Sequence, residues 1–382
     1  MYPFKIDEIL LKLYELKGSD LHIMAGQPPT FRISGELAPM PDAPPLTGED
    51  IEIFFKDVLT EADLNIFTQR KDMDFAYQIP NGPRFRGNAL TNSGTIGMVF
   101  RVFPMNIPPF ETLGLPPAVK NLIHLPRGLV LVTGTTGSGK STTLASMINL
   151  INTTMATNIV TVEDPIEYVH KSQLSFVRQR EIGVDTISYN SALRSVLRQD
   201  PDIILIGEMR DRESIAIALS AAETGHLVFS TLHTQSAPQT ISRIIDAFEP
   251  AQKEQVRQQL ASTLKAVISQ QLLKNHKTGG RSAAVEFMST VPAISNLIRE
   301  GKEHQLYSII QTSSNIGMQT MDMALAKLVM QGKITNEQAF ESCIDKSAVV
   351  SLVSGENTEL RRQINADPGS NSMLNPNRSI SL

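Results

Sequence analysis

Short apolar runs alternate with amphipathic segments through the middle of the chain, and this alternation predicts a mostly parallel sheet covered by helices. The run at 128–133, GLVLVT, is rich in branched residues, as a strand buried on both faces is. An apolar helical stripe follows at 144–151. Further buried strands are predicted at 159–162, 202–208 and 227–232. Strands alternating with helices are typical of α/β domains.

Shorter elements precede this region, and they predict a small α+β domain. An apolar stripe over 6–14 predicts a helix that stops at Gly18. Short strands are expected at 20–23 and 30–34, on either side of a Pro28-Pro29 turn. The remaining elements predicted here are a helix capped by Thr47 and strands at 73–79, 84–90 and 96–103.

Prolines mark the boundary between two domains, because five of them fall between residues 104 and 117. We therefore predict an N-terminal domain at 1–103, an interdomain linker at 104–117 and a larger domain at 118–350. Residues 351–382 are poor in apolar side chains and are expected to form a flexible tail. The last part of the larger domain is expected to be helical, at 251–272, 292–300, 318–330 and 335–343.

The composition is ordinary for a globular protein, with 41% apolar and 19% charged residues among 382. A net charge of −4 disfavours attraction to nucleic acid, so no nucleic-acid partner is expected. No stretch approaches the ~18 consecutive apolar residues of a membrane span, so direct membrane insertion is not expected. The single cysteine, Cys343, excludes an internal disulfide and a multi-cysteine zinc site, and it fits a reducing cytosol.

The segment 134–141, GTTGSGKS, matches the phosphate-binding loop pattern GxxxxGK[ST], between a predicted strand and a predicted helix. Glycines let the backbone turn so that successive N–H groups converge on phosphate oxygens. Lys140 adds a charge at the β- and γ-phosphates, and the Ser141 hydroxyl is a Mg²⁺ ligand. The expected cofactors are therefore ATP and Mg²⁺. The residues expected to hold the nucleotide are Gly134, Thr135, Thr136, Gly137, Ser138, Gly139, Lys140, Ser141 and Thr142.

Residues able to perform catalysis stand at the ends of the predicted strands. Thr133, Glu163, Glu208 and His233 each follow or end an apolar run, and ligands bind at the carboxyl ends of parallel strands. We expect Glu163 to position and deprotonate water, and Glu208 to hold Mg²⁺ directly or through water. We expect His233 to contact the γ-phosphate. His226 should lie at the opposite edge, because seven strand residues span roughly 23 Å.

Four segments together resemble the nucleotide-binding motifs of one family. They are GTTGSGKSTTL (134–144), VTVEDPIEYVH (160–170), LRQDPDIILIGEMRD (197–211) and ETGHLVFSTLHT (223–234). They are similar to the Walker A, Asp-box, Walker B and His-box elements of the secretion ATPases of type II secretion and type IV pili, above all to those of pilus retraction and twitching motility. Further segments extend the resemblance over 5–345: GSDLHI (18–23), RFRGNA (84–89), ISQQLL (268–273), AISNLIRE (293–300) and GMQTMDMAL (317–325).

The resemblance implies a PAS-like N-terminal domain, a RecA-like ATPase domain and a homohexameric ring. It implies a cytoplasmic location at the inner face of the cytoplasmic membrane, with an inner-membrane platform protein and the pilus machinery as partners. It also implies arginines that reach the nucleotide from the N-terminal domain or a neighbouring subunit. By motif position these are Arg86, Arg101 and Arg243. A solvated strand face is the alternative interpretation of Arg86 and Arg101.

Several functions remain open within this resemblance, and an ATP-driven pilus-retraction motor is favoured. Ser295, where retraction ATPases usually carry arginine, and the long tail leave open a paralogous accessory retraction ATPase. A pilus-extension or type II secretion ATPase usually has a four-cysteine zinc site, which one cysteine cannot form. The net charge disfavours a nucleic-acid translocase. Glu163 and Glu208 together disfavour a module that uses ATP only as a switch.

Overall fold

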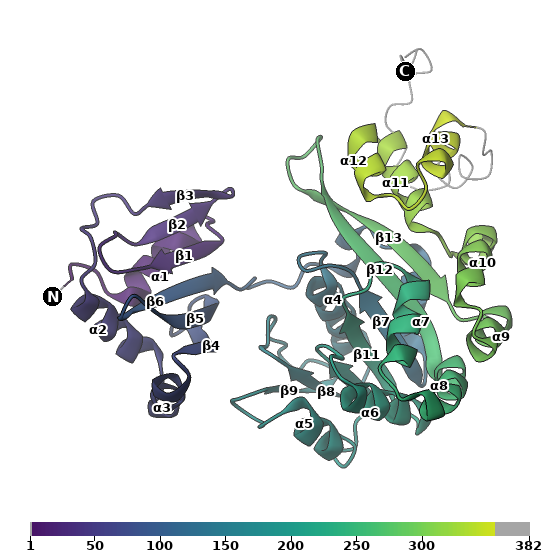
Figure 1. Cartoon of the computed structure of the whole chain (residues 1–382), viewed down its shortest axis with the longest axis horizontal. Helices are drawn as coiled ribbons and strands as arrows, with labels where there is room; N and C mark the ends of the chain where they lie inside the picture. Colours follow the sequence, from purple (N-terminus) through teal and green to yellow (C-terminus); the bar gives the residue numbers. More distant parts are fainter. Residues whose placement is uncertain (1, 356–382) are drawn as a thin grey trace. The chain divides into compact units, whose positions relative to one another are not determined.

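A computed structural model describes residues 2–355, which form two compact units (Figure 1). The first unit extends to Ile107 and includes Pro165–Val169, and the second covers Pro108–Asp164 and the chain from His170 onward. The change from one unit to the other at residue 107 falls inside the proline-rich stretch at 104–117. Each unit has its own sheet and its own hydrophobic core.

The first unit is a six-stranded antiparallel sheet in the order β3-β2-β1-β6-β5-β4, with helices against one face. Its strands are β1 Asp20–Ile23, β2 Thr30–Ile33, β3 Glu36–Pro39, β4 Asp72–Gln78, β5 Arg84–Asn92 and β6 Thr95–Val102. Its helices are α1 Ile6–Glu15, α2 Gly48–Val58 and α3 Glu61–Arg70. The predicted cap of α2 is confirmed, since Thr47 Oγ1 accepts a hydrogen bond from the Asp50 N–H at 3.2 Å. Strand β3 and helix α3 were not predicted.

The second unit is a seven-stranded sheet in the order β13-β12-β7-β11-β10-β8-β9, parallel except for β13. Its strands are β7 Gly128–Thr133, β8 Asn158–Glu163, β9 Phe176–Glu181, β10 Ile203–Ile206, β11 Leu227–Leu232, β12 Leu264–Lys274 and β13 Arg281–Ser289. Its helices are α4 Lys140–Thr154, α5 Tyr189–Val196, α6 Arg212–Glu223, α7 Ala237–Asp246, α8 Pro250–Thr263, α9 Pro292–Glu300, α10 Leu306–Thr312, α11 Met321–Met330, α12 Asn336–Ser342 and α13 Lys346–Ser354. Four short 3-10 helices complete it: η1 Phe110–Leu113, η2 Pro117–His124, η3 Glu303–Gln305 and η4 Ser314–Ile316.

Apolar layers cover both faces of this second sheet, which is why its strands read as continuous apolar runs. Helices α5 to α10 pack on one face, whereas α4, η1 and η2 pack on the other. The sequence-based expectation of a mixed parallel α/β core is confirmed.

The prediction of one helix over 251–272 is wrong in its second half. Helix α8 ends at Thr263, and β12 begins at Leu264 and pairs with β7 on one side and β13 on the other. Val267 and Ile268 are both fully buried, in the cores on opposite faces of the sheet. A strand buried on both faces has no two-residue alternation, so its apolar spacing also fitted a helix. Strands β9 and β13 were not predicted.

The C-terminal helices extend beyond the predicted domain end at residue 350. Helix α13 runs to Ser354 because Val349 is buried, and Leu352 and Val353 pack against the cluster around α11. The predicted flexible tail therefore begins too early, and its remaining part, 356–382, lies outside the described residues.

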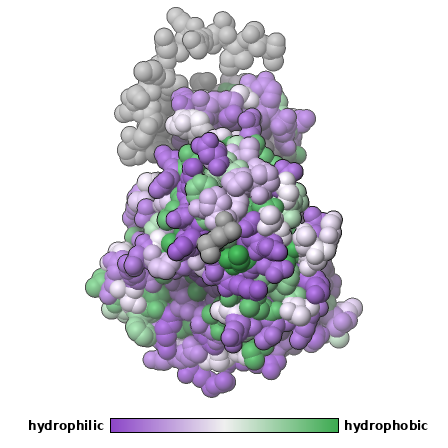
Figure 2. Space-filling view, turned by 90° about the vertical axis from the view of Figure 1, so that its left-hand side faces the viewer, coloured by the Kyte–Doolittle hydropathy of each residue, from purple (hydrophilic) through white to green (hydrophobic). Residues whose placement is uncertain are grey.

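Hydrophilic residues predominate on the face shown in Figure 2, and hydrophobic ones lie among them in small groups. Within residues 2–355 no helix combines the length and the apolar character that a bilayer crossing requires.

Candidate active site

The phosphate-binding loop has the backbone shape that its glycines allow. Gly134, Gly137 and Gly139 have φ of +143°, +80° and +92°, in the region that favours glycine. A Cβ at Gly134 would stand 2.4 Å from the Gln270 carbonyl and from Ser138 Oγ, so a side chain is excluded there. The buried Ser138 hydroxyl has no hydrogen-bond partner among residues 2–355. Such a tight, polar cradle fits a phosphate group.

Helix α4 begins at Lys140, directly after this loop. Its N-cap is Gly139, which has no side chain to bond the first helical N–H groups. Those groups and the positive end of the helix dipole are suited to an anion. Lys140 Nζ donates to the Gly134 carbonyl at 2.8 Å and to the Thr135 carbonyl at 3.1 Å. Ser141 and Thr142 follow in the first turn of the helix.

The strands that carry the predicted catalytic residues are neighbours, in the order β7-β11-β10-β8. All are parallel, with Thr133 opposite Leu232 and Ile206 opposite both Ser230 and Val162. Glu163, Glu208 and His233 therefore lie with the loop at one carboxyl edge. His226 lies at the other edge, where its carbonyl accepts from the Gly128 N–H at 3.0 Å. The predicted separation of the two histidines is confirmed.

Glu208 and His233 contact each other directly, from the ends of adjacent strands. His233 Nε2 lies 3.1 Å from Glu208 Oε1. The other carboxylate oxygen accepts from Arg210 Nε at 2.8 Å, and Arg210 Nη1 lies 3.6 Å from an Asp164 carboxylate oxygen. The Glu208 side chain is only 19% exposed. Carboxylate oxygens suit Mg²⁺, so this position is compatible with the predicted metal role.

Glu163 stands at the end of β8, next to β10. Its Oε1 accepts a hydrogen bond from Thr161 Oγ1 at 2.6 Å and another from Gln179 Nε2 at 3.1 Å. These two donors orient the carboxylate at the sheet edge. Two strands separate β8 from β7, so Glu163 faces the loop from across the site, about 14 Å away at ~4.8 Å per strand.

Two residues at this edge were missed by the sequence reasoning. Gln179 lies on β9, an edge strand that was not predicted. Tyr189 opens α5, and its hydroxyl would stand 2.9 Å from a Cβ placed on Gly207. Burial, and then the nearby Asp164, Glu163 and Glu208, raise the pKa of Tyr189, while Arg210 lowers it. Its hydroxyl therefore lies among the acids that end β8 and β10.

The predicted arginines of the first unit are directly opposite each other on β5 and β6. Arg101 Nε lies 2.9 Å from Asp20 Oδ1, and Arg86 Nη2 lies 3.2 Å from Asp74 Oδ2. Adjacent like charges repel, and these carboxylates offset that repulsion. Burial alone would raise the pKa of the Asp20 carboxyl, but hydrogen bonds from Ser19 and Arg101, with the neighbouring positive charges, lower it overall.

Arg243 lies in the last turn of α7 and is exposed. Whether Arg86, Arg101 or Arg243 reaches a nucleotide stays a prediction, as do the chemical roles of the strand-end residues.

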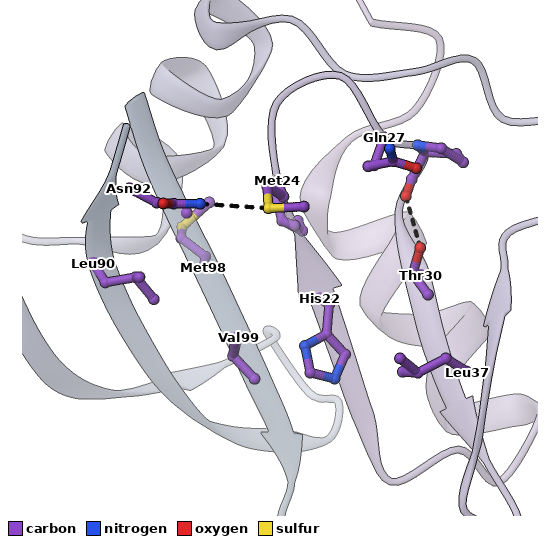
Figure 3. A pocket seen from close by; sticks show the side chains of 12 residues that line it. His22, Met24, Gln27, Thr30, Leu37, Leu90, Asn92, Met98 and Val99 are labelled. Carbon is purple, nitrogen blue, oxygen red and sulfur yellow. Dashed lines mark hydrogen bonds between the residues drawn. The ribbon is translucent and has the colours of Figure 1, made fainter. Parts of the chain in front are cut away.

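A pocket of about 380 Å³ lies on the helix-free face of the first sheet (Figure 3). Its lining is mainly apolar and includes Leu37, Leu90 and Val99, together with His22 of β1. The Asn92 amide donates to the Met24 sulfur at 3.6 Å at one end. An apolar hollow is poorly suited to a triphosphate, so the loop edge of the second unit is the candidate active site.

The sequence is similar to those of known proteins. The family described as type II/IV secretion system protein matches residues 5–341. The type IV pilus retraction ATPase PilT of Pseudomonas aeruginosa is 48% identical over 336 residues, which are 88% of this chain and 97% of that protein. The type IV pilus ATPase PilU of the same organism is 41% identical over 335 residues, 88% of this chain and 87% of that protein.

A solved structure shows the same fold. The crystal structure of the pilus retraction motor PilT with bound ADP superposes with a TM-score of 0.85 at 47% identity, covering 90% of this chain and 98% of that one. The predicted RecA-like ATPase fold with a smaller α+β unit is confirmed. The resemblance inferred from the motifs is confirmed as well.

Proposed function

Because the chain belongs to the type II/IV secretion system protein family, we propose that it is an ATP-hydrolysing motor that powers type IV pilus retraction and twitching motility. The observation that carries the proposal is the similarity to PilT over nearly the whole of that protein. The geometry supports it, because a phosphate cradle and the three side chains predicted to be catalytic share one sheet edge.

Each residue at this sheet edge has a separate role in the proposed reaction. The N–H groups of the loop bind the phosphates, and Lys140 exchanges its two carbonyl partners for phosphate oxygens. Ser141 and Glu208 would hold Mg²⁺, which when bound would withdraw charge from the phosphate oxygens. Glu163 orients a water and accepts its proton. His233 contacts the γ-phosphate and, through Glu208, registers its departure.

In the transition state negative charge spreads over the γ-phosphate, and additional positive charge is needed to stabilise it. We assign this positive charge to the side chains of Arg86, Arg101 and Arg243, which reach the nucleotide within a homohexameric ring. Asp20 and Asp74 hold the first two until then. An arginine of this kind contributes ~10³–10⁵ in rate.

We place the ring in the cytoplasm at the inner face of the cytoplasmic membrane, with an inner-membrane platform protein and the pilus machinery as partners. The similarity to PilT supports this placement. The second candidate function is an accessory retraction motor beside a paralogous ATPase, which the 41% identity to PilU favours.

Deleting the gene and counting surface pili tests the proposal. A retraction motor predicts too many pili and loss of twitching, and a Lys140→Ala allele should fail to restore either. Too few pili would instead identify an extension motor. A normal pilus number with weakened retraction would favour the accessory role.

A further inference from the structure

A row of buried polar side chains crosses the second sheet beneath α7. Thr133 on β7 lies opposite Ser269 on β12, which lies opposite Glu286 on β13. All three are fully buried, on the face where α7 packs in an otherwise apolar core. Thr133 Oγ1 donates to Ser269 Oγ at 2.8 Å. The row leads from the end of the phosphate-loop strand to a buried acid.

Glu286 contacts the start of α7. Its Oε1 accepts a hydrogen bond from the Ala237 N–H at 2.7 Å. Ala237 is the first residue of α7 and follows His233 by four positions. A carboxylate at a helix N-terminus is favourably placed for the helix dipole.

Stability alone does not explain an acid at this position. Burial raises the pKa of Glu286 to about 7, against the lowering effect of the Ala237 and Met321 N–H groups, and the Asp322 carboxylate raises it further. Asp322 on α11 in turn accepts from the Tyr307 hydroxyl of α10 at 2.9 Å. Taking a carboxylate out of water is unfavourable, so a buried acid is weak evidence for a stabilising role.

The turn between β11 and α7 carries His233, and local bonds shape it. Thr234 Oγ1 lies 2.7 Å from Thr240 Oγ1, and the Gln235 N–H donates to Gln239 Oε1 at 3.2 Å. Those bonds tie the turn to α7 itself. The bond from Ala237 to Glu286 ties the start of α7 to the sheet.

We propose that Glu286 is a positioning residue for His233, because by holding the Ala237 N–H it fixes the 233–236 turn and so the contact between His233 and Glu208. This inference rests on the proposed ATPase function. It predicts that the rate of ATP turnover depends on the hydrogen bond that Glu286 accepts from Ala237, although Glu286 touches neither the nucleotide loop nor His233.

The test uses two substitutions of Glu286 in the full-length protein, with ATP affinity, kcat and melting temperature measured for each. Glu286→Leu removes the acceptor; it should lower kcat at least ~10-fold, because small misplacements cost up to about 10²-fold. ATP affinity should stay within about threefold of wild type. Its melting temperature is compared with that of wild type at pH 8, because loss of the buried charge and loss of the acceptor for the Ala237 N–H act in opposite directions.

Glu286→Gln separates the hydrogen bond from the charge. Its amide oxygen still accepts from Ala237, so kcat should stay within about threefold of wild type. Protonation of Glu286, whose pKa is raised to about 7, leaves a carbonyl oxygen that can still accept from Ala237, so wild-type kcat and the glutamine variant's kcat should follow the same pH profile through pH 7. The groups that face Glu286, Asp322 and Tyr307, are unchanged in this comparison.

Phe287→Leu is the matched control, since Phe287 is equally buried on the same strand but belongs to the core of the opposite face. It should lower the melting temperature and leave kcat unchanged. If Glu286→Leu has the wild-type kcat, the inference is wrong, although the proposed ATPase function stands. The same holds if Glu286→Leu and Phe287→Leu lose kcat equally. Absence of ATP hydrolysis by the wild-type protein would overturn the proposed function and the inference with it.

Discussion

The phosphate loop and the arginine-bearing strands handle charge in different ways. The loop is built from backbone, with glycine conformations and a helix start that fix its N–H groups. The arginines are long side chains on a sheet face, 68% exposed for Arg101 and 44% for Arg86, each paired with an acid of its own unit. The fixed N–H groups of the loop are suited to bind phosphate throughout the ATPase cycle. The exposed arginine side chains are suited to contact the nucleotide only during part of that cycle. The predictions below test this division.

The largest effect is expected from Lys140→Ala. Without the ammonium group the backbone N–H groups alone would face the γ-phosphate, so tight ATP binding and turnover should both be lost. Direct nucleotide binding and phosphate release measure this. Turnover equal to wild type would show that the loop is not the nucleotide site.

Arg101→Ala should leave ATP affinity within about tenfold of wild type and reduce turnover ~10³-fold. The reason is that Arg101 is proposed to act on charge that develops only in the transition state. A parallel loss of binding would mean that it belongs to the permanent phosphate site, which would remove the contrast between the two regions.

Asp20→Asn should lower turnover ~10-fold without changing ATP affinity, because Arg101 loses its buried carboxylate partner. The lowered pKa of Asp20 means that its carboxylate adds stability above pH ~4 and that this is lost at lower pH. The melting temperatures of the variant and wild type should therefore differ at pH 7 and approach each other as the pH falls below ~4. Asp74→Asn is the control; its exposed pair with Arg86 should matter little for stability.

Tyr189→Phe should have the smallest effect, about a threefold loss of turnover with unchanged ATP affinity. The ring would still pack against the core, and only the hydroxyl among the strand-end acids would be lost. Steady-state kinetics measure this. A loss of turnover as large as that of Arg101→Ala would show that Tyr189 is a catalytic residue and not one that makes only a minor contribution to the site.

Local signals made the loop and the strand ends predictable from the sequence. The GxxxxGKS pattern is contiguous, and buried parallel strands are continuous apolar runs, so Glu163, Glu208 and His233 could be placed at one edge before the structure was known. Strand β12 was misread because it is buried on both faces and because its parallel partner β7 lies far earlier in the sequence. Gln179 and Glu286 were missed for the same reason, since their contacts with Glu163 and Ala237 span 16 and 49 residues.

The central claim is that the edge formed by β7, β11, β10 and β8 hydrolyses ATP, with Glu163 as the proton acceptor. The direct measurement is Mg²⁺-dependent ATP turnover and ATP affinity of the purified wild-type, Glu163→Gln and Glu208→Gln proteins. We predict that Glu163→Gln binds ATP like wild type and turns it over at least ~10²-fold more slowly, because its amide keeps the shape but accepts no proton. If Glu208→Gln is the slow variant with normal affinity, and Glu163→Gln turns over like wild type, the assignment of the two acids is contradicted.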